Sequence, residues 1–171
     1  PLSVEAALRR FTFKPGDLII LNDPYQGGTH LPDVTLVRPV FAGKTLEFLT
    51  ASRAHYSDIG GMAPGSMPVS TDLYQEGFVL PPVRLTAEVR SLLLANVRNP
   101  REVEGDVAAQ EACCETGAKR LLDLLSPRSA HRPFLAAWYH ATTAQMYRDG
   151  GYGEATYHLE HALQVLPDDP N

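Results

Sequence analysis

One segment, residues 22–33, concentrates side chains that can bind a metal ion between two apolar runs. Its sequence, NDPYQGGTHLPD, contains Asp23 and places His30 three residues before Asp33. The two glycines make the backbone before His30 flexible, and Pro32 stiffens the backbone between His30 and Asp33. A loop of this composition can aim two ligands at one point, so we interpret the segment as half of a metal site.

A second segment, residues 53–61, repeats the pattern. In RAHYSDIGG, His55 precedes Asp58 by three residues, so we interpret the two segments as halves of one site. Imidazole and carboxylate ligands together suit Mn, Fe or Zn better than Ca or Mg, and no cysteine lies near to favour a thiolate site. The alternative is structural, because a single histidine is more often hydrogen-bonded than a ligand and Asp23 is a usual turn former.

Strands are expected to position both segments. Residues 17–23 form a continuous apolar run closed by turn formers, which is typical of a strand buried on both faces. Residues 33–41 alternate between apolar and polar side chains and are rich in β-branched residues, so they predict a second strand. Residues 44–55 predict a third strand after a turn at Gly43, and this strand runs directly into the second histidine.

Helices are expected to flank these strands. Ser3 could cap a short amphipathic helix over residues 3–11, and Thr71 or Asp72 could cap a helical turn. Residues 88–97 predict another helix, and the next begins after the cap formed by Asn99. That last helix should run to about Leu125, with one packing stripe: Val103, Val107, Cys114, Ala118, Leu121 and Leu125. The pattern predicts an α+β fold in which a mixed β-sheet has flanking helices, with Cys113 and Cys114 in or near the core.

Residues 60–71, rich in glycine and proline, predict an ordered surface loop beside the histidines rather than regular structure. A glycine-rich loop after a strand can bind phosphate. No Walker lysine follows here, however, and no helix opens directly after the glycines, so we expect no nucleotide site on this chain. A plain structural loop is the alternative.

Composition limits the classes of partner. The chain has 171 residues, a formal net charge of -5 and a pI of about 5.6, which gives no reason to expect a nucleic acid partner. No apolar run reaches membrane-spanning length, no signal peptide opens the chain, and the adjacent cysteines suit a reducing cytosol, so we expect a cytoplasmic protein. Pro1 is not an initiator, which indicates a processed or partial chain.

The C-terminal part differs in kind. Two prolines, with Ser126 and Ser129, mark a linker over residues 127–133, after a first domain over residues 1–126 and before a helix pair over residues 134–171. The pair is predicted to be antiparallel, turning at Gly150 and Gly151. It resembles one tetratricopeptide repeat through Tyr139, Met146, Tyr152, Ala155, Leu159, Ala162 and Pro167. A single repeat cannot cover its own apolar face, so we expect a protein partner at these helices.

The first domain resembles a known family. The motifs NDPYQGGTHLPDVTLVRPVF, RAHYSDIGGMAPGSMP, LYQEGFVLPPVRL and LLLANVRNPREVEGDVAAQ follow one another in this order nearly without gaps. They resemble the hydantoinase B family, which includes 5-oxoprolinase and the large subunit of acetone carboxylase. The resemblance covers roughly residues 1–125 and implies an internal piece of a longer protein.

The resemblance implies a function. Members of this family open five-membered cyclic amides such as hydantoins and 5-oxoproline with ATP, or carboxylate acetone. In these enzymes the metal lies in the hydantoinase B-type subunit, and a hydantoinase A-type partner subunit handles ATP. When the family's metal site is carried onto this sequence, the resemblance implies His30, Asp33 and His55 as the first-choice ligands. Asp23 and Asp58 would be further ligands or carboxylates that orient the imidazoles.

We therefore expect a fragment of a metal-dependent hydrolase subunit that acts on a small cyclic amide, without assigning its catalytic residues. The alternative is a non-catalytic interaction module whose helical repeat binds another protein.

Overall fold

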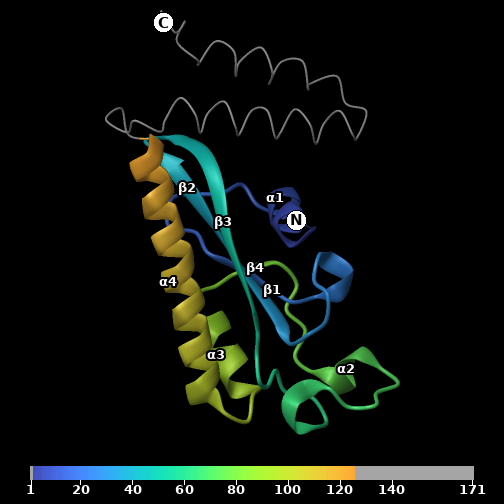
Figure 1. The fold of residues 1–171 in the computed structure, drawn as a ribbon. Helices are drawn as coiled ribbons and strands as arrows, with labels where there is room; N and C mark the ends of the chain where they lie inside the picture. The colour runs from blue at the N-terminus through green and yellow to red at the C-terminus, as the bar shows by residue number, and fades with distance from the viewer. Residues whose placement is uncertain (1, 126–171) are drawn as a thin grey trace, which may run out of the picture. The chain divides into compact units, whose positions relative to one another are not determined.

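The computed structural model describes residues 2–125, with side chains to residue 123 (Figure 1). The chain divides into two compact units, Pro1–Lys119 and Arg120–Asn171. In chain order the elements are α1 (Leu2–Arg10), β1 (Ile19–Leu21), the 3-10 helix η1 (Pro24–Gln26), β2 (Asp33–Ala42), β3 (Thr45–His55), the 3-10 helix η2 (Pro64–Ser66), α2 (Leu73–Glu76), β4 (Val83–Arg84), α3 (Ala87–Ala95) and α4 (Pro100–Leu125).

The four strands form one sheet in the order β3-β2-β1-β4. All three pairings are antiparallel, so the α+β class is confirmed, but the prediction of a mixed sheet is wrong for the described residues. The prediction failed because β1, an uninterrupted apolar run, looks the same in sequence whichever direction its neighbours run. β2 and β3 form a long hairpin around Gly43, whose positive φ of 63° suits the tight reversal.

Helices cover both faces of the sheet (Figure 1). Alternate residues of β1 divide between two cores: Ile20 packs with residues of α3 and α4, whereas Ile19 and Leu21 pack with Ala7 of α1. Burial on both faces, as predicted for this strand, therefore comes from helices on opposite sides.

α4 begins as predicted, with Asn99 accepting a hydrogen bond from the amide of Glu102. Its predicted stripe is buried at four positions, Val103, Val107, Cys114 and Ala118. Cys113 points the other way and is exposed, so its predicted place in the core is wrong, because a neighbour in a helix is turned by about 100°. Both cysteines are free thiols.

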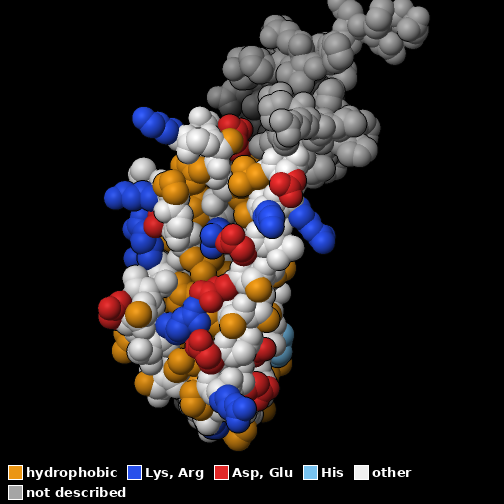
Figure 2. Space-filling view, turned by 90° about the vertical axis from the view of Figure 1, so that its left-hand side faces the viewer, with side chains coloured by type: hydrophobic (Ala, Val, Ile, Leu, Met, Phe, Trp, Pro, Cys, Tyr) orange, Lys and Arg blue, Asp and Glu red, His pale blue; other side chains and the backbone are white. Residues whose placement is uncertain are grey.

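The outer surface of α3 and α4 carries charges of both signs (Figure 2). Arg90 of α3 lies 2.8 Å from Glu104 and also contacts Glu111, and Arg38 of β2 contacts Glu115. Interspersed charges of this kind leave no broad single-sign patch on the face that Figure 2 presents.

α1 departs from its predicted start. Ser3 is not a cap but lies inside the helix, because its hydroxyl is used elsewhere, donating to the carbonyl of Gly27. α2 is capped by Asp72, whose side chain accepts from the amide of Tyr74. β4 follows directly after Pro81 and Pro82 and lies at the edge of the sheet, where a proline removes no ladder hydrogen bond.

Two predictions concern residues beyond this description. The linker over residues 127–133 and the helix pair over residues 134–171 lie outside the described residues. None of the helices described between residues 2 and 125 is long and apolar enough to cross a membrane.

Candidate metal centre

Asp33 and His55 come from neighbouring strands. Asp33 is the first residue of β2 and His55 the last of β3, and they are partners in the register of the hairpin. Side chains of directly opposed residues lie on the same face of a sheet, so the strands themselves bring the two together. His55 Nδ1 lies 3.3 Å from Asp33 Oδ1.

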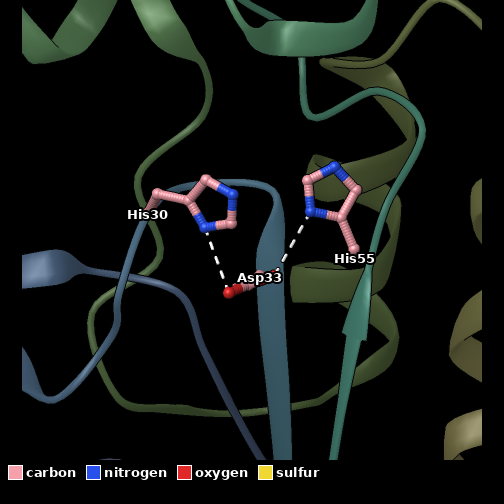
Figure 3. A group of neighbouring side chains, drawn as sticks. All are labelled: His30, Asp33 and His55. Carbon is pink, nitrogen blue, oxygen red and sulfur yellow. Dashed lines mark hydrogen bonds and ion pairs between the residues drawn. The ribbon is translucent and has the colours of Figure 1, made fainter.

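His30 reaches the same carboxylate from the loop before β2 (Figure 3). The amide of Asp33 donates to the carbonyl of His30 at 3.0 Å, which closes a turn around Leu31 and Pro32. This turn sets His30 Nδ1 3.1 Å from Asp33 Oδ2. The two imidazoles thus flank one carboxylate, with ring centroids 5.1 Å apart.

The side chain of Asn22 holds the loop that carries His30 in place through hydrogen bonds. Asn22 is fully buried, and its side-chain amide donates to the carbonyls of Leu31 and Phe78. Its side-chain oxygen accepts from the amide of Leu80 at 2.6 Å. Since Leu31 follows His30 directly, this buried amide ties the histidine loop to the segment before β4.

The three side chains fit a divalent ion. Each offers one ligand atom, and these atoms lie within 4.8 Å of one another. Ligands bound at about 2.0–2.2 Å to one ion lie roughly 3–4 Å apart. The separations of 3.1 and 3.3 Å found here run to different oxygens of Asp33, so small side-chain adjustments would bring the three residues onto one ion. Two imidazoles and one carboxylate are a donor set suited to Zn or Fe.

His30 Nδ1 supplies a further observation. The atom is buried and lies beside Asp33, yet no atom of the described residues makes a hydrogen bond with it. The nitrogen lies at ion-pair distance, 3.1 Å, from Asp33 Oδ2, although the geometry is not that of a hydrogen bond, and this placement beside a carboxylate is compatible with a metal ligand. The His55 side chain is 53% exposed, which leaves one side of the cluster open to water or substrate.

Asp23 does not join this cluster. Its carboxylate caps η1, accepting from the amide of Tyr25 at 2.9 Å and from the side chain of Gln26 at 2.6 Å. Both oxygens are therefore engaged within the loop. Asp23 shapes the loop that carries His30 rather than facing the imidazoles.

Asp58 also lies apart from the cluster. Its buried carboxylate accepts from the backbone amide of Arg98 at 2.6 Å and from the guanidinium of Arg98 at 2.7 Å. Burial by itself would raise the pKa of Asp58, but the bonds from Arg98 and from the amide of Gly60 outweigh it, so the pKa lies below its ordinary value. The structure therefore gives this acid a structural partner instead of an imidazole.

The loop over residues 60–71 is ordered by hydrogen bonds. Ser66 donates to the carbonyl of Gly60 and accepts from the amide of Ile59. Arg98 also donates to the carbonyl of Gly61. The loop includes one short 3-10 helix, η2, which the prediction of no regular structure missed.

Comparison of this chain with models of known protein families shows which family it belongs to. The model of the family described as Hydantoinase B/oxoprolinase matches residues 1–145. The chain belongs to the hydantoinase B/oxoprolinase family. The match extends past residue 126, into the segment that the sequence pattern assigned to a linker and a repeat, and the comparisons do not support the tetratricopeptide-like repeat.

Two relatives and one solved structure show how far the family match extends. Caprolactamase subunit beta of Pseudomonas jessenii is 40% identical over 117 residues, which cover 64% of this chain and 20% of that protein. The 5-oxoprolinase of Saccharomyces cerevisiae is 51% identical over 78 residues, 44% of this chain and 6% of that protein. The crystal structure of the ATP-dependent caprolactamase from Pseudomonas jessenii matches with a TM-score of 0.67 at 30% identity, covering 84% of this chain and 28% of that chain. The chain thus spans a fifth or less of the length of these two relatives.

Sequence reasoning missed residues that support the centre from a distance. Gln110 of α4 is buried, accepts from the hydroxyl of Tyr56, and donates to the carbonyls of Val34 and Ser52. It lies behind the strand ends that carry Asp33 and His55. A polar residue within the apolar stripe of α4 was the one local signal that could have revealed it.

Proposed function

We propose that this chain contributes the metal-binding part of a subunit that hydrolyses cyclic amides, with ATP handled by a separate hydantoinase A-type subunit. The observation that carries the proposal is the convergence of His30, Asp33 and His55 on one point in a hydantoinase B/oxoprolinase family chain. The names of the relatives, a caprolactamase and a 5-oxoprolinase, support a cyclic amide as the substrate class.

His30, Asp33 and His55 would hold the ion. A bound Mn, Fe or Zn ion supplies Lewis acidity for an amide carbonyl or a bound water. The carboxylate of Asp33 places a negative charge between the two imidazoles, and the β2–β3 register keeps His55 in place without a loop movement. The turn closed between His30 and Asp33 does the same for the other ring.

The proposed division of labour rests on two facts. The sequence contains no Walker-type phosphate loop, and one similar protein is named as the beta subunit of its enzyme. A second subunit that binds ATP accounts for both. The partner would have to reach the open side of the cluster, next to the half-exposed ring of His55.

Activity tests the proposal. The chain should be expressed with a hydantoinase A-type subunit and assayed for ATP-dependent hydrolysis of hydantoin, 5-oxoproline and caprolactam, before and after chelation. We expect hydrolysis of at least one ring, loss of activity on chelation and in Asp33→Ala, and retention in Asp23→Asn, whose carboxylate lies outside the cluster. Equal activity in Asp33→Ala and the unmodified chain would overturn the proposal.

A further inference from the structure

Arg53 is an arginine surrounded by hydroxyl groups. Its Nε donates to Thr35 Oγ1 at 3.1 Å, its Nη1 to Thr29 Oγ1 at 2.7 Å and its Nη2 to Ser3 Oγ at 2.8 Å. These three partners come from β2, the histidine loop and α1. They hold the guanidinium in one place without neutralising its charge.

Arg53 has no acid partner among the described residues, whereas most of the other arginines there do. Five other arginines of the described part each contact a carboxylate: Arg9, Arg38, Arg84, Arg90 and Arg98. Within residues 2–123, no carboxylate lies within ion-pair distance of Arg53. A guanidinium has five N–H donors, so one N–H on each Nη remains without a partner among these residues. Arg53 as a whole is an exposed residue, so solvent reaches its side chain.

Arg53 lies on the same face of the hairpin as the candidate metal centre. In the register of β2 and β3, it pairs with Thr35, two residues along from the pair formed by Asp33 and His55. Side chains two residues apart on a strand point to the same face, about 7 Å apart. Thr29, which receives one of the three hydrogen bonds, directly precedes His30.

We propose that Arg53 binds an oxyanion of the substrate, a carboxylate or a phosphoryl group, beside the ion held by His30, Asp33 and His55. Two N–H donors on the two Nη atoms of a rigid guanidinium match the two oxygens of such a group. The inference rests on the proposed function and narrows its substrate class. It favours a cyclic amide that carries a carboxylate, or one that reaches the site with a phosphoryl group attached.

Three probes separate these cases. They are 5-oxoproline, 2-pyrrolidinone, which is the same ring without the carboxylate, and inorganic phosphate. Calorimetry on the full chain should give Kd values for each probe with the unmodified protein, Arg53→Gln and Arg53→Lys. Arg38→Gln is the matched control, because Arg38 lies on the same hairpin and pairs with Glu115 of α4 on the opposite face.

In Arg53→Gln we expect affinity for at least one anionic probe to fall by about 10-fold to 100-fold, since a charge-assisted pair is lost. A fall for 5-oxoproline alone identifies a carboxylate, and a fall for phosphate alone identifies a phosphoryl group. Affinity for 2-pyrrolidinone should change by less than about twofold, and Arg38→Gln should leave all three values unchanged. Arg53→Lys should also lose affinity, because an ammonium lacks the fork.

Three results would overturn the inference. They are no binding of either anion by the unmodified protein, an equal loss for all three probes in Arg53→Gln, and unchanged anion affinity in a folded Arg53→Lys. Metal content, measured on the same samples, keeps the two proposals apart. If Arg53→Gln retains its metal and hydrolytic activity together with full anion affinity, this inference fails alone. If anion affinity depends on Arg53 but no cyclic amide is hydrolysed, the proposed function fails alone.

Discussion

Asp33 and His55 face each other across the end of the β2–β3 hairpin, with His55 Nδ1 3.3 Å from Asp33 Oδ1. Because the backbone ladder of two strands sets their separation, this half of the centre is rigid before any ion binds. The other half depends on a loop, since His30 is positioned by a turn and by the buried side chain of Asn22. Substitutions in the loop should therefore affect the centre differently from substitutions in the strands.

Gly27 is the first test of this loop. Its φ is 94°, and a Cβ there would lie 2.5 Å from the backbone oxygen of Leu2 in α1. Gly16 has a similar φ of 88°, but a Cβ there would have no atom within 4 Å, so this glycine is the matched control. We expect Gly16→Ala to cost about 1–2 kcal/mol for the left-handed backbone, and Gly27→Ala at least about 1 kcal/mol more. Urea unfolding measures both, and equal costs would contradict the close contact between α1 and the loop.

Gln110 is the second test, because it satisfies buried groups behind the strand ends. Burial raises the pKa of Tyr56, so its hydroxyl stays protonated at neutral pH and donates to Gln110. Gln110→Leu should destabilise the fold by roughly 2–4 kcal/mol, since the hydroxyl and two carbonyls lose this partner, and Tyr56→Phe by about 1 kcal/mol. Thr116→Ala, at an exposed position of α4, should stay within about 0.5 kcal/mol.

Thermal or urea unfolding of the three variants gives the ranking. A cost for Gln110→Leu no greater than that for Thr116→Ala would show that this hydrogen-bonded group does not hold α4 against the hairpin.

The sequence could predict the three clustered residues because the relevant signals are local. The spacing of His30 and Asp33 lies within one loop, and a β-branched run ends at His55. It could not predict which acid His55 meets. The spacing favoured Asp58, but Asp58 is bonded to Arg98, 40 positions away, and the hairpin register gives His55 to Asp33 instead.

Long-range partners explain the other failures. Arg53 meets Ser3 50 positions away, and Gln110 meets Val34 76 positions away, so the neighbouring sequence does not name the partner of either residue. The antiparallel direction of the strands beside β1 could not be predicted either, because an apolar run buried on both faces has the same sequence pattern in parallel and antiparallel sheets. The strand and helix positions themselves followed local periodicity and turn residues, and were predicted well.

Asp58 predicts a pH dependence of stability. Its pKa in the folded protein lies below the ordinary value of 3.8, because bonds from Arg98 and Gly60 outweigh the effect of burial. A carboxyl with a depressed folded pKa contributes stability that is fully present above its unfolded pKa and is lost as pH falls through the folded pKa. We expect Asp58→Asn to be destabilised at pH 7 and to approach the stability of the unmodified protein as pH falls below 3.8.

Denaturant unfolding between about pH 2.5 and pH 7 measures this difference. A gap between the two proteins that stays constant with pH would show that the Asp58 carboxylate is not the group that Arg98 stabilises.

Metal content tests the central claim most directly. Protein purified without chelator and loaded with Mn, Fe or Zn should be analysed by elemental mass spectrometry as the unmodified chain, His30→Ala and Asp23→Asn. The account predicts about one divalent ion per chain in the unmodified protein and in Asp23→Asn, and loss of the ion in His30→Ala while the fold is retained. An unmodified chain that binds no ion, or a His30→Ala variant that binds it as well as the unmodified chain does, would contradict the account.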